Sequence, residues 1–537
     1  MNRRTFVLLA ALGIGVPLIG SGADGEAPQQ TAAARSHRPF KWEEATVSDF
    51  QAAMQSGKET AVSLAEAYMG RIDEVDRAGP MLKSVLEVNP DALEMARGLD
   101  DERKAKGPRG PLHGIPVLLK DNIDTHDRMM TTAGSLALLG SIPPLDAFVA
   151  QRLREAGAVI LGKTNLSEWA NFRGDRSTSG WSARGGQTKN PYVLDRNPSG
   201  SSSGSAVAVC ANLCAIALGT ETDGSIISPS SLCGIVGIKP TVGLISRAGI
   251  IPISNSQDTA GPMARSVRDA ALLLGALTEV DPRDPITEQS RGKAHTDYTQ
   301  FLNENGLRGA RLGVARRFFR LGRPGSNVIE SAIEKMKQCG AEMVELADKE
   351  LFGGFGDAEQ QVLLYEFKHG LNSYLASLGP NAPMRTLDEV IKFNERNKEK
   401  EMPFFGQEVF IRAQEKGPLT DQAYLDAVEK CRRLSRAEGI DALMDRHQLD
   451  AIVAPSGGPA GTIDPVYGDR DAGGSSSPAA VAGYPNITVP AGHVHGLPVG
   501  ISFFGRAYSE PKLLKLAYAF EQATKARKAP RFLPTVE

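Results

Sequence analysis

Pro198-Ser-Gly-Ser-Ser-Ser-Gly-Ser205, followed by Gly219-Thr-Glu-Thr-Asp-Gly-Ser225, is the most unusual part of this sequence, because glycine and small hydroxyl residues concentrate there. Glycines let a backbone turn sharply and bring several N–H groups to one point. Serine supplies a nucleophile, which a neighbouring group must deprotonate. A pair of ordinary Gly/Ser turns is the plain alternative, and for a Gly/Ser run alone it is the better interpretation.

Two short serine-hydrolase patterns also match the chain. Gly200-Ser-Ser-Ser-Gly204 fits GxSxG with Ser202 as nucleophile, but that turn must follow a strand, and the preceding residues 193–198 are short, polar and closed by proline. Ser290-Arg-Gly-Lys293 fits SxxK, but it lies in a polar stretch without an SDN or KTG companion. We interpret both matches as accidental.

A longer set of motifs fits far more of the chain. Gly200-Ser-Ser-Ser-Gly-Ser205, Gly219-Thr-Glu-Thr-Asp-Gly-Ser-Ile226 and Cys233-Gly-Ile-Val-Gly-Ile-Lys-Pro-Thr241 together resemble the signature of the amidase signature family. His113-Gly-Ile-Pro-Val-Leu-Leu-Lys-Asp-Asn122 resembles its lysine motif, and Trp169-Ala-Asn-Phe-Arg-Gly174 resembles the bacterial peptide-amidase subgroup. The resemblance covers roughly residues 40–532.

The resemblance implies a catalytic triad of Lys120, Ser201 and Ser225, with the two serines 24 residues apart and a cis peptide bond between Gly200 and Ser201. A lysine removed from water is disfavoured as an ammonium. Neutral Lys120 is therefore expected to draw a proton from Ser201, which draws one from the nucleophile Ser225. The implied oxyanion and substrate-binding positions are Thr222, Asp223, Gly224, Ala170 and Ser202. No metal and no organic cofactor is expected.

Some residues have simpler interpretations or depart from the family pattern. Taken alone, Lys120 at the end of an apolar run could extend its ammonium to the surface. Ile227 stands where many family members have arginine, and Asp223 stands where many have glycine. We interpret Asp223 as a carboxyl group that orients a substrate amide or disfavours an anionic substrate.

The composition is that of a folded globular protein with an α/β pattern. The 537 residues carry a formal net charge of -2, which offers no attraction for nucleic acid, and the five cysteines form no CxxC pair. We predict a large twisted mixed β-sheet with helices on both faces and a helical, pocket-shaping region over residues 281–445. The strands are expected at 115–119, 159–161, 235–238, 311–314, 343–346, 451–454, 487–490 and 499–504, and helices at 267–277, 328–338 and 512–526.

The N-terminus predicts export. Asn2-Arg3-Arg4-Thr5-Phe6-Val7-Leu8 and the apolar run to Gly20 are typical of a twin-arginine signal peptide, over residues 1–23. Residues 24–39 are expected to form a linker before a single domain at 40–532. An uncleaved N-terminal anchor is the alternative. The expected location is periplasmic or extracellular, with no stable membrane anchor after cleavage.

The predicted activity is hydrolysis of primary carboxamides, with the C-terminal amide of peptides favoured. The expected partner is a small-molecule or peptide amide, and no nucleic acid is expected to bind. The alternatives are the glutaminase subunit of a tRNA amidotransferase and a catalytically silent binding protein on the same fold. The oligomeric state stays open.

Overall fold

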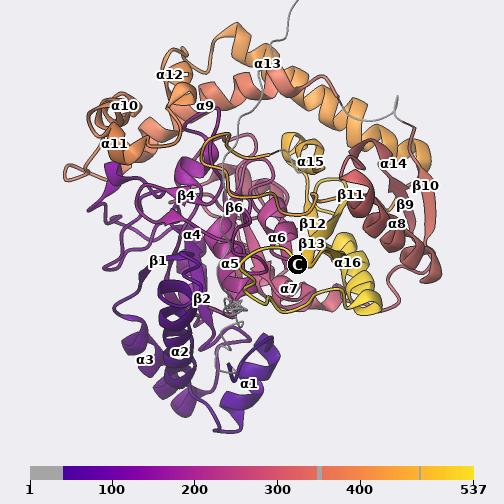
Figure 1. The fold of residues 1–537 in the computed structure, drawn as a ribbon, viewed down its shortest axis with the longest axis horizontal. Coiled ribbons are helices and arrows are strands. Elements are labelled where there is room, and N and C mark those ends of the chain that lie inside the picture. The colour runs from indigo at the N-terminus through magenta and orange to yellow at the C-terminus, as the bar shows by residue number, and fades with distance from the viewer. Residues whose placement is uncertain (1–39, 348–352, 471–472) are drawn as a thin grey trace, which may run out of the picture. The chain divides into compact units, whose positions relative to one another are not determined.

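The computed structural model describes residues 40–347, 353–470 and 473–537, and residues 40–537 form one compact unit. The predicted signal and linker at 1–39 lie outside the described residues. The described part contains an 11-stranded mixed sheet in the order β1-β3-β2-β6-β8-β7-β12-β13-β11-β9-β10, flanked by helices (Figure 1). The predicted α/β fold with a large mixed sheet is confirmed.

All eight predicted strands are present, with bounds that differ by a few residues. They are β2 (Pro116–Lys120), β3 (Val159–Thr164), β7 (Val236–Lys239), β9 (Arg311–Val314), β10 (Glu342–Glu345), β11 (Ala451–Pro455), β12 (Asn486–Val494) and β13 (Leu497–Phe504). The other three strands of this sheet, β1 (Val85–Val88), β6 (Ile216–Glu221) and β8 (Thr259–Ala264), were not predicted. The hydrophobic pattern does not indicate β6, because the apolar half of this strand is short and its second half, from Gly219, is polar.

The strands β2 and β6 decide where the chemistry-bearing residues meet. They run parallel, with Leu119 opposite Leu218, so their carboxyl ends emerge at the same edge of the sheet. In parallel sheets, ligands bind outside the carboxyl ends of the strands. Lys120, the last residue of β2, therefore lies beside Thr220 near the end of β6.

The short helix α5 (Ser203–Cys210) is wholly buried beside these strands. The helix packs closely against the backbone of Ser84 and Asn165, since a Cβ on Gly204 would lie 2.4 Å from their carbonyl oxygens. Only glycine fits there. The helix α6 (Ile227–Leu232) follows the segment that carries Ser225.

The three predicted helices are α7 (Val267–Leu277), α8 (Gly322–Gln338) and α16 (Glu510–Thr524). Within 281–445, β9, α8 and β10 build the sheet edge, and a run of helices follows, which lies along the top of Figure 1. These helices are α9 (Gly356–Ser377), α10 (Leu387–Arg396), α11 (Lys398–Glu401), α12 (Glu408–Gln414), α13 (Gln422–Arg432) and α14 (Asp441–His447). The helix α9 packs on loops of the sheet edge, because Phe367 and Leu371 share an apolar cluster with Trp169 and Ile251.

The remaining elements are α1 (Val47–Gln55), α2 (Ala61–Arg71), α3 (Ala92–Lys106), α4 (Phe148–Glu155), α15 (Ser476–Ala482) and the small ribbon of β4 (Trp181–Ser182) and β5 (Gly186–Gln187). Among the described residues, no helix has the length and apolarity needed to cross a membrane.

Candidate active site

Lys120 is enclosed at the end of β2 and does not extend to the surface. Its side chain is 0% exposed, so the interpretation of a surface ammonium is wrong. Nζ lies 2.7 Å from Ser201 Oγ and 2.8 Å from Thr220 Oγ1, with the Thr220 carbonyl oxygen at 3.3 Å. Burial lowers the pKa of Lys120 to about 7, although Glu221 and Asp258 oppose the shift. A large fraction of Lys120 is therefore uncharged at neutral pH.

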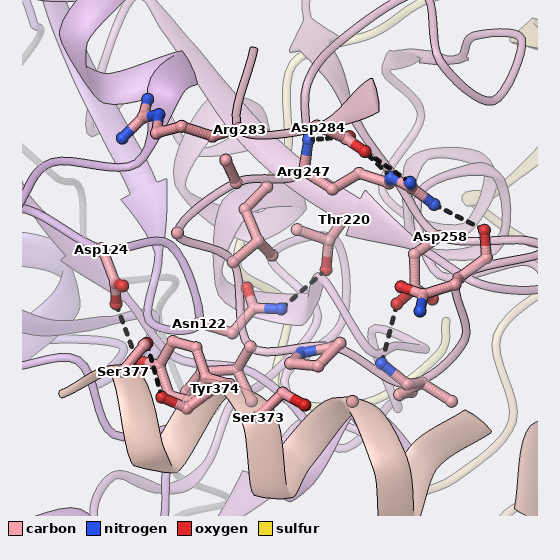
Figure 2. Close-up of a pocket in the computed structure, with 18 of the residues that line it drawn as sticks. Asn122, Asp124, Thr220, Arg247, Asp258, Arg283, Asp284, Ser373, Tyr374 and Ser377 are labelled. Carbon is pink, nitrogen blue, oxygen red and sulfur yellow. Dashed lines mark hydrogen bonds and ion pairs between the residues drawn. The ribbon is translucent and has the colours of Figure 1, made fainter. Parts of the chain in front are cut away.

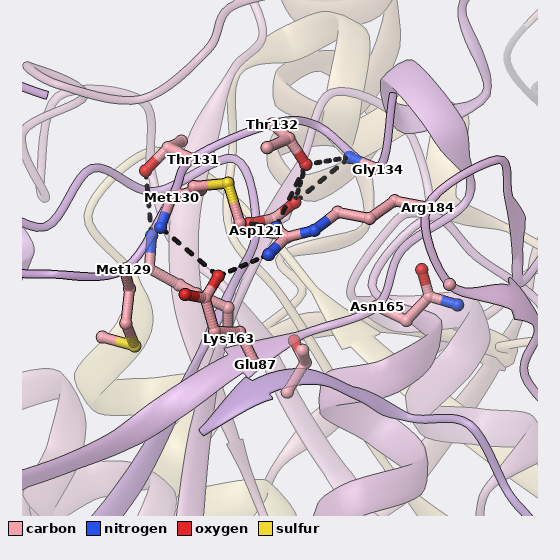
Figure 3. A network of polar contacts seen from close by, with 12 residues as sticks. Glu87, Asp121, Met129, Met130, Thr131, Thr132, Gly134, Lys163, Asn165 and Arg184 are labelled. Carbon is pink, nitrogen blue, oxygen red and sulfur yellow. Dashed lines mark hydrogen bonds and ion pairs between the residues drawn. The ribbon is translucent and has the colours of Figure 1, made fainter. Parts of the chain in front are cut away.

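The residue after Lys120 fixes the end of β2 through a network of charges (Figure 3). The Asp121 carboxylate accepts from the Arg184 guanidinium at 3.1 Å, and Arg184 also pairs with Glu87 on β1. The backbone N–H of Gly134 donates to the same Asp121 carboxylate at 3.2 Å. Since Asp121 is 0% exposed and held by these partners, the neighbouring Lys120 is held in a fixed direction.

The two predicted relay serines come from segments that a backbone hydrogen bond joins. The Gly200–Ser201 peptide bond is cis, and Ser201 is 0% exposed. The next N–H, of Ser202, donates to the carbonyl oxygen of Ser225 at 3.1 Å, which brings Ser225 beside Ser201. Ser225 is 8% exposed, so of these serines it is the one that a ligand can reach.

Ser202 is enclosed and ties its loop to β6. Its side chain is 0% exposed, and its hydroxyl donates to the Thr220 carbonyl oxygen at 3.0 Å. No strand precedes it, since residues 192–199 contain none. The structure therefore gives no support to the GxSxG interpretation, and Ser202 as a substrate-binding residue stays a prediction.

The segment 222–225 presents unpaired donors. It lies between β6 and α6, and none of its four backbone N–H groups donates to a described residue. Gly224 has φ +80°, a left-handed conformation that favours glycine and helps successive N–H groups to converge. Such a concave set of donors suits a developing negative charge. The predicted positions Thr222, Asp223 and Gly224 lie in this donor-lined segment, and their role in binding an oxyanion stays a prediction.

Two carboxylates hold this segment in place. Glu221 accepts from the N–H groups of Ile226 and Ile227 at 2.7 and 2.9 Å. The Thr222 hydroxyl donates to Asp258 at 2.6 Å. Burial raises the pKa of Glu221 and raises that of Asp258 to about 6.

Ala170 lies in a strained turn that faces the same region. Trp169, Ala170 and Asn171 all have positive φ, at 50°, 55° and 67°. A fully buried ion pair flanks this turn, with Arg173 Nε 2.9 Å from Glu168 Oε1. The turn is thereby held, and Ala170 lines the adjoining cavity.

This cavity, of about 460 Å³, opens beside the carboxyl end of β6 (Figure 2). Its floor includes Asn122, Ala170 and residues 220–222, and α9 forms one wall with Ser373, Tyr374 and Ser377. The charged groups on its walls are mostly paired. Arg247 forms two hydrogen bonds to Asp284, at 2.6 and 2.8 Å, and the Tyr374 hydroxyl donates to Asp124 at 2.8 Å. The cavity therefore suits a largely neutral ligand of modest size.

Sequence reasoning missed several residues of this site. Thr220 and Asn122 lie inside recognised motifs, but nothing in the sequence indicated that Asn122 Nδ2 donates to Thr220 Oγ1 at 3.0 Å. Asp258 comes from a distant segment. Within the described ranges, no group of three or more His, Cys, Asp or Glu residues is placed to hold a metal ion.

The fold and this arrangement of lysine, serines and free N–H groups fit an enzyme that hydrolyses amide bonds. The family model described as Amidase matches residues 63–514, and the chain belongs to this family.

Three relatives show the range of the family around this chain. The crystal structure of the native peptide amidase from Stenotrophomonas maltophilia is 52% identical, with a TM-score of 0.87, and the match covers 92% of this chain and 100% of that one. An Arabidopsis thaliana protein named "Probable amidase At4g34880" is 46% identical over 92% of this chain and 93% of its own length. A glutamyl-tRNA(Gln) amidotransferase subunit from Thermoanaerobacter pseudethanolicus is 32% identical over 90% of this chain and 98% of its own length.

Proposed function

We propose that this amidase hydrolyses primary carboxamides, with the C-terminal amide of peptides as its favoured substrate, through an acyl-enzyme on Ser225. The observation that carries the mechanism is the buried Lys120, whose Nζ lies 2.7 Å from Ser201 Oγ and whose pKa burial lowers to about 7. The likeness to the Stenotrophomonas peptide amidase supports the substrate class.

In the proposed reaction, neutral Lys120 accepts the proton of Ser201 as Ser201 accepts that of Ser225. Ser225 Oγ attacks the carboxamide carbon, and the N–H groups of 222–225 bind the resulting oxyanion. The relay then runs in reverse and protonates the departing nitrogen, which leaves as ammonia. Water, deprotonated by the same relay, hydrolyses the ester on Ser225 and releases the carboxylate.

The test measures ammonia release from an amidated dipeptide, an aryl carboxamide and free glutamine. We expect the amidated dipeptide to react fastest, and Ser225→Ala to lose at least three orders of magnitude in kcat. Ser228→Ala, a hydroxyl change three residues away, serves as the matched control. Full activity of Ser225→Ala would refute the proposed nucleophile, whereas a preference for glutamine would favour a glutaminase.

We also propose that residues 1–23 direct export as a twin-arginine-type signal. The support is the Arg3-Arg4 pair before an apolar run, and these residues lie outside the described part of the chain. The measurement is the N-terminal mass of the protein recovered from the periplasm of a host bacterium, with Arg3→Lys/Arg4→Lys as the comparison. A full-length chain confined to the cytoplasm in both cases would contradict the proposal.

A further inference from the structure

Asp223 brings an ionisable side chain into the oxyanion-binding segment. It precedes Ser225 by two positions, so the Cα atoms of these two residues are at most about 7 Å apart. A charge on this carboxyl group therefore acts on any ligand whose carbonyl carbon lies at Ser225. No other residue of the segment 222–225 is ionisable.

A second carboxyl group reaches Asp223 from α9. Glu359, in the first turn of that helix, is hydrogen-bonded to the Asp223 carboxyl group. Two carboxyl groups can form such a bond only when one of them carries a proton. Burial raises the pKa of both carboxyl groups, and the nearby Asp223 charge helps to raise that of Glu359 to about 8. The pair therefore holds close to one negative charge at neutral pH.

Neighbouring side chains fix the pair against the nucleophile loop. The Ser476 hydroxyl, at the start of α15, donates to Asp223 Oδ1 at 2.5 Å. Gln257 Nε2 donates both to Glu359 Oε1 at 3.0 Å and to the Thr222 carbonyl oxygen at 3.3 Å. The charge is thus held at one place beside Ser225.

No direct ion pair cancels this charge among the described residues. The ionisable groups that face Asp223 are Lys239 on β7 and Glu221 on β6, and Cys431 on α13 faces Glu359. Lys239 gives its hydrogen bonds to the carbonyl oxygens of Tyr484 and Pro240, at 2.8 and 3.0 Å. Burial lowers the pKa of Lys239 to about 8, so Lys239 is still mostly protonated at neutral pH and offsets part of this charge through space without pairing with it.

We infer that the Asp223–Glu359 pair is a specificity device that rejects carboxylates at the Ser225 site. The inference rests on the proposed function. A carboxamide substrate is neutral, whereas its hydrolysis product carries a full negative charge at the same position. At the effective dielectric constant of about 20 that suits protein sites, like charges within about 12 Å of each other repel strongly enough to weaken binding by at least tenfold. The pair therefore favours uptake of the amide and release of the acid.

The test compares binding of N-acetylphenylalanine amide and N-acetylphenylalanine to Ser225→Ala protein by calorimetry, so that no turnover interferes. In this parent we expect the acid to bind at least tenfold more weakly than the amide at pH 7. Asp223→Asn together with Glu359→Gln should reduce that ratio by about tenfold. Asp357→Asn, an exposed acid on the same turn of α9, is the matched control and should leave the ratio unchanged.

The single variants give opposite results if the inference is right. Glu359→Gln still donates to Asp223 and concentrates the charge beside Ser225, so discrimination should be kept or increased. Asp223→Asn moves the charge to α9, so discrimination should fall. In the Ser225→Ala parent, the ratio of the Kd of the acid to the Kd of the amide should also rise between pH 6 and pH 9, because the second carboxyl group of the pair loses its proton.

An unchanged ratio in the double variant, with normal binding of the amide, overturns this inference and leaves the proposed function intact. Equal loss of discrimination in the two single variants overturns it as well. Failure of the parent to bind the amide at all refutes the proposed function and this inference with it.

Discussion

Replacing Lys120 by methionine should abolish activity and yet stabilise the protein, by an amount that depends on pH. The pKa of Lys120 falls from 10.5 in the unfolded chain to about 7 in the folded protein, because the side chain is fully buried. This difference of roughly 3.5 pKa units corresponds to about 5 kcal/mol of destabilisation at low pH. Methionine removes that cost but leaves the Ser201 hydroxyl without its Lys120 partner, at about 1–3 kcal/mol, whereas the Thr220 hydroxyl keeps its hydrogen bond from Asn122.

The pH dependence of the stability difference reports on Lys120 alone, because the lost hydrogen bonding does not change with pH. Between pH 7 and pH 10.5 the unfolded chain binds one more proton at Lys120 than the folded chain, so stability of the parent rises with pH. The stability difference between Lys120→Met and the parent should therefore shrink by about 1 kcal/mol for each pH unit from 7 to 9. The other buried lysines cancel in this difference.

The assay is urea denaturation at pH 7, 8 and 9, followed by tryptophan fluorescence, with the exposed Lys398→Met as control. A stability difference that is the same at all three values would show that Lys120 is not buried as an uncharged amine. The proposed relay would then be wrong, because its first step needs that neutral base.

Three further predictions follow from the same structure. The kcat/KM should fall about tenfold for each pH unit below an apparent pKa near 7, because Lys120 must be neutral to accept a proton. Asp258→Asn should shift this acidic limb of the pH profile to lower pH, because it removes a negative charge that favours the ammonium form. An acidic limb that Asp258→Asn leaves unchanged would contradict this assignment. Glu221→Gln should lower kcat at least tenfold in steady-state assays with little change in KM, since the N–H groups of Ile226 and Ile227 lose their charged acceptor. Phe520→Ala, in the buried face of α16, should lower the unfolding free energy by about 3–5 kcal/mol in urea titrations while kcat of the folded fraction stays unchanged.

The elements that the sequence predicted well are those with a local signal. The apolar run at 116–120 and the periodic helix α16 are visible in the chain itself, because burial of a strand or of a helix face demands those residues. The family resemblance also implied that Lys120 and Ser201 lie close together, and the structure gives 2.7 Å between Nζ and Oγ. What the motifs could not predict is the strand β6, where polar Thr220 and Glu221 occupy strand positions because their side chains serve the site and not the core.

Glu359 shows a second limit of sequence reasoning. It lies in a charged helical region, far along the chain from the serine motifs, and an acid in the first turn of a helix needs no explanation beyond the helix dipole. Only the packing of α9 against the loop 253–258 and the segment 222–225 brings it to Asp223. A contact of this kind leaves no local pattern, so a single sequence cannot reveal it.

The electrostatics of the site also explain how several acids can surround a lysine whose pKa is lowered. Glu221 and Asp258 each favour the ammonium form of Lys120, but burial outweighs them, and it raises their own pKa values at the same time. Instead, Glu221 accepts hydrogen bonds from the N–H groups of Ile226 and Ile227, and Asp258 accepts one from the Thr222 hydroxyl. The same carboxylates therefore fix the donor-lined loop without forming an ion pair with the base. Had either one contacted Nζ directly, Lys120 would stay protonated at neutral pH and could not accept a proton from Ser201.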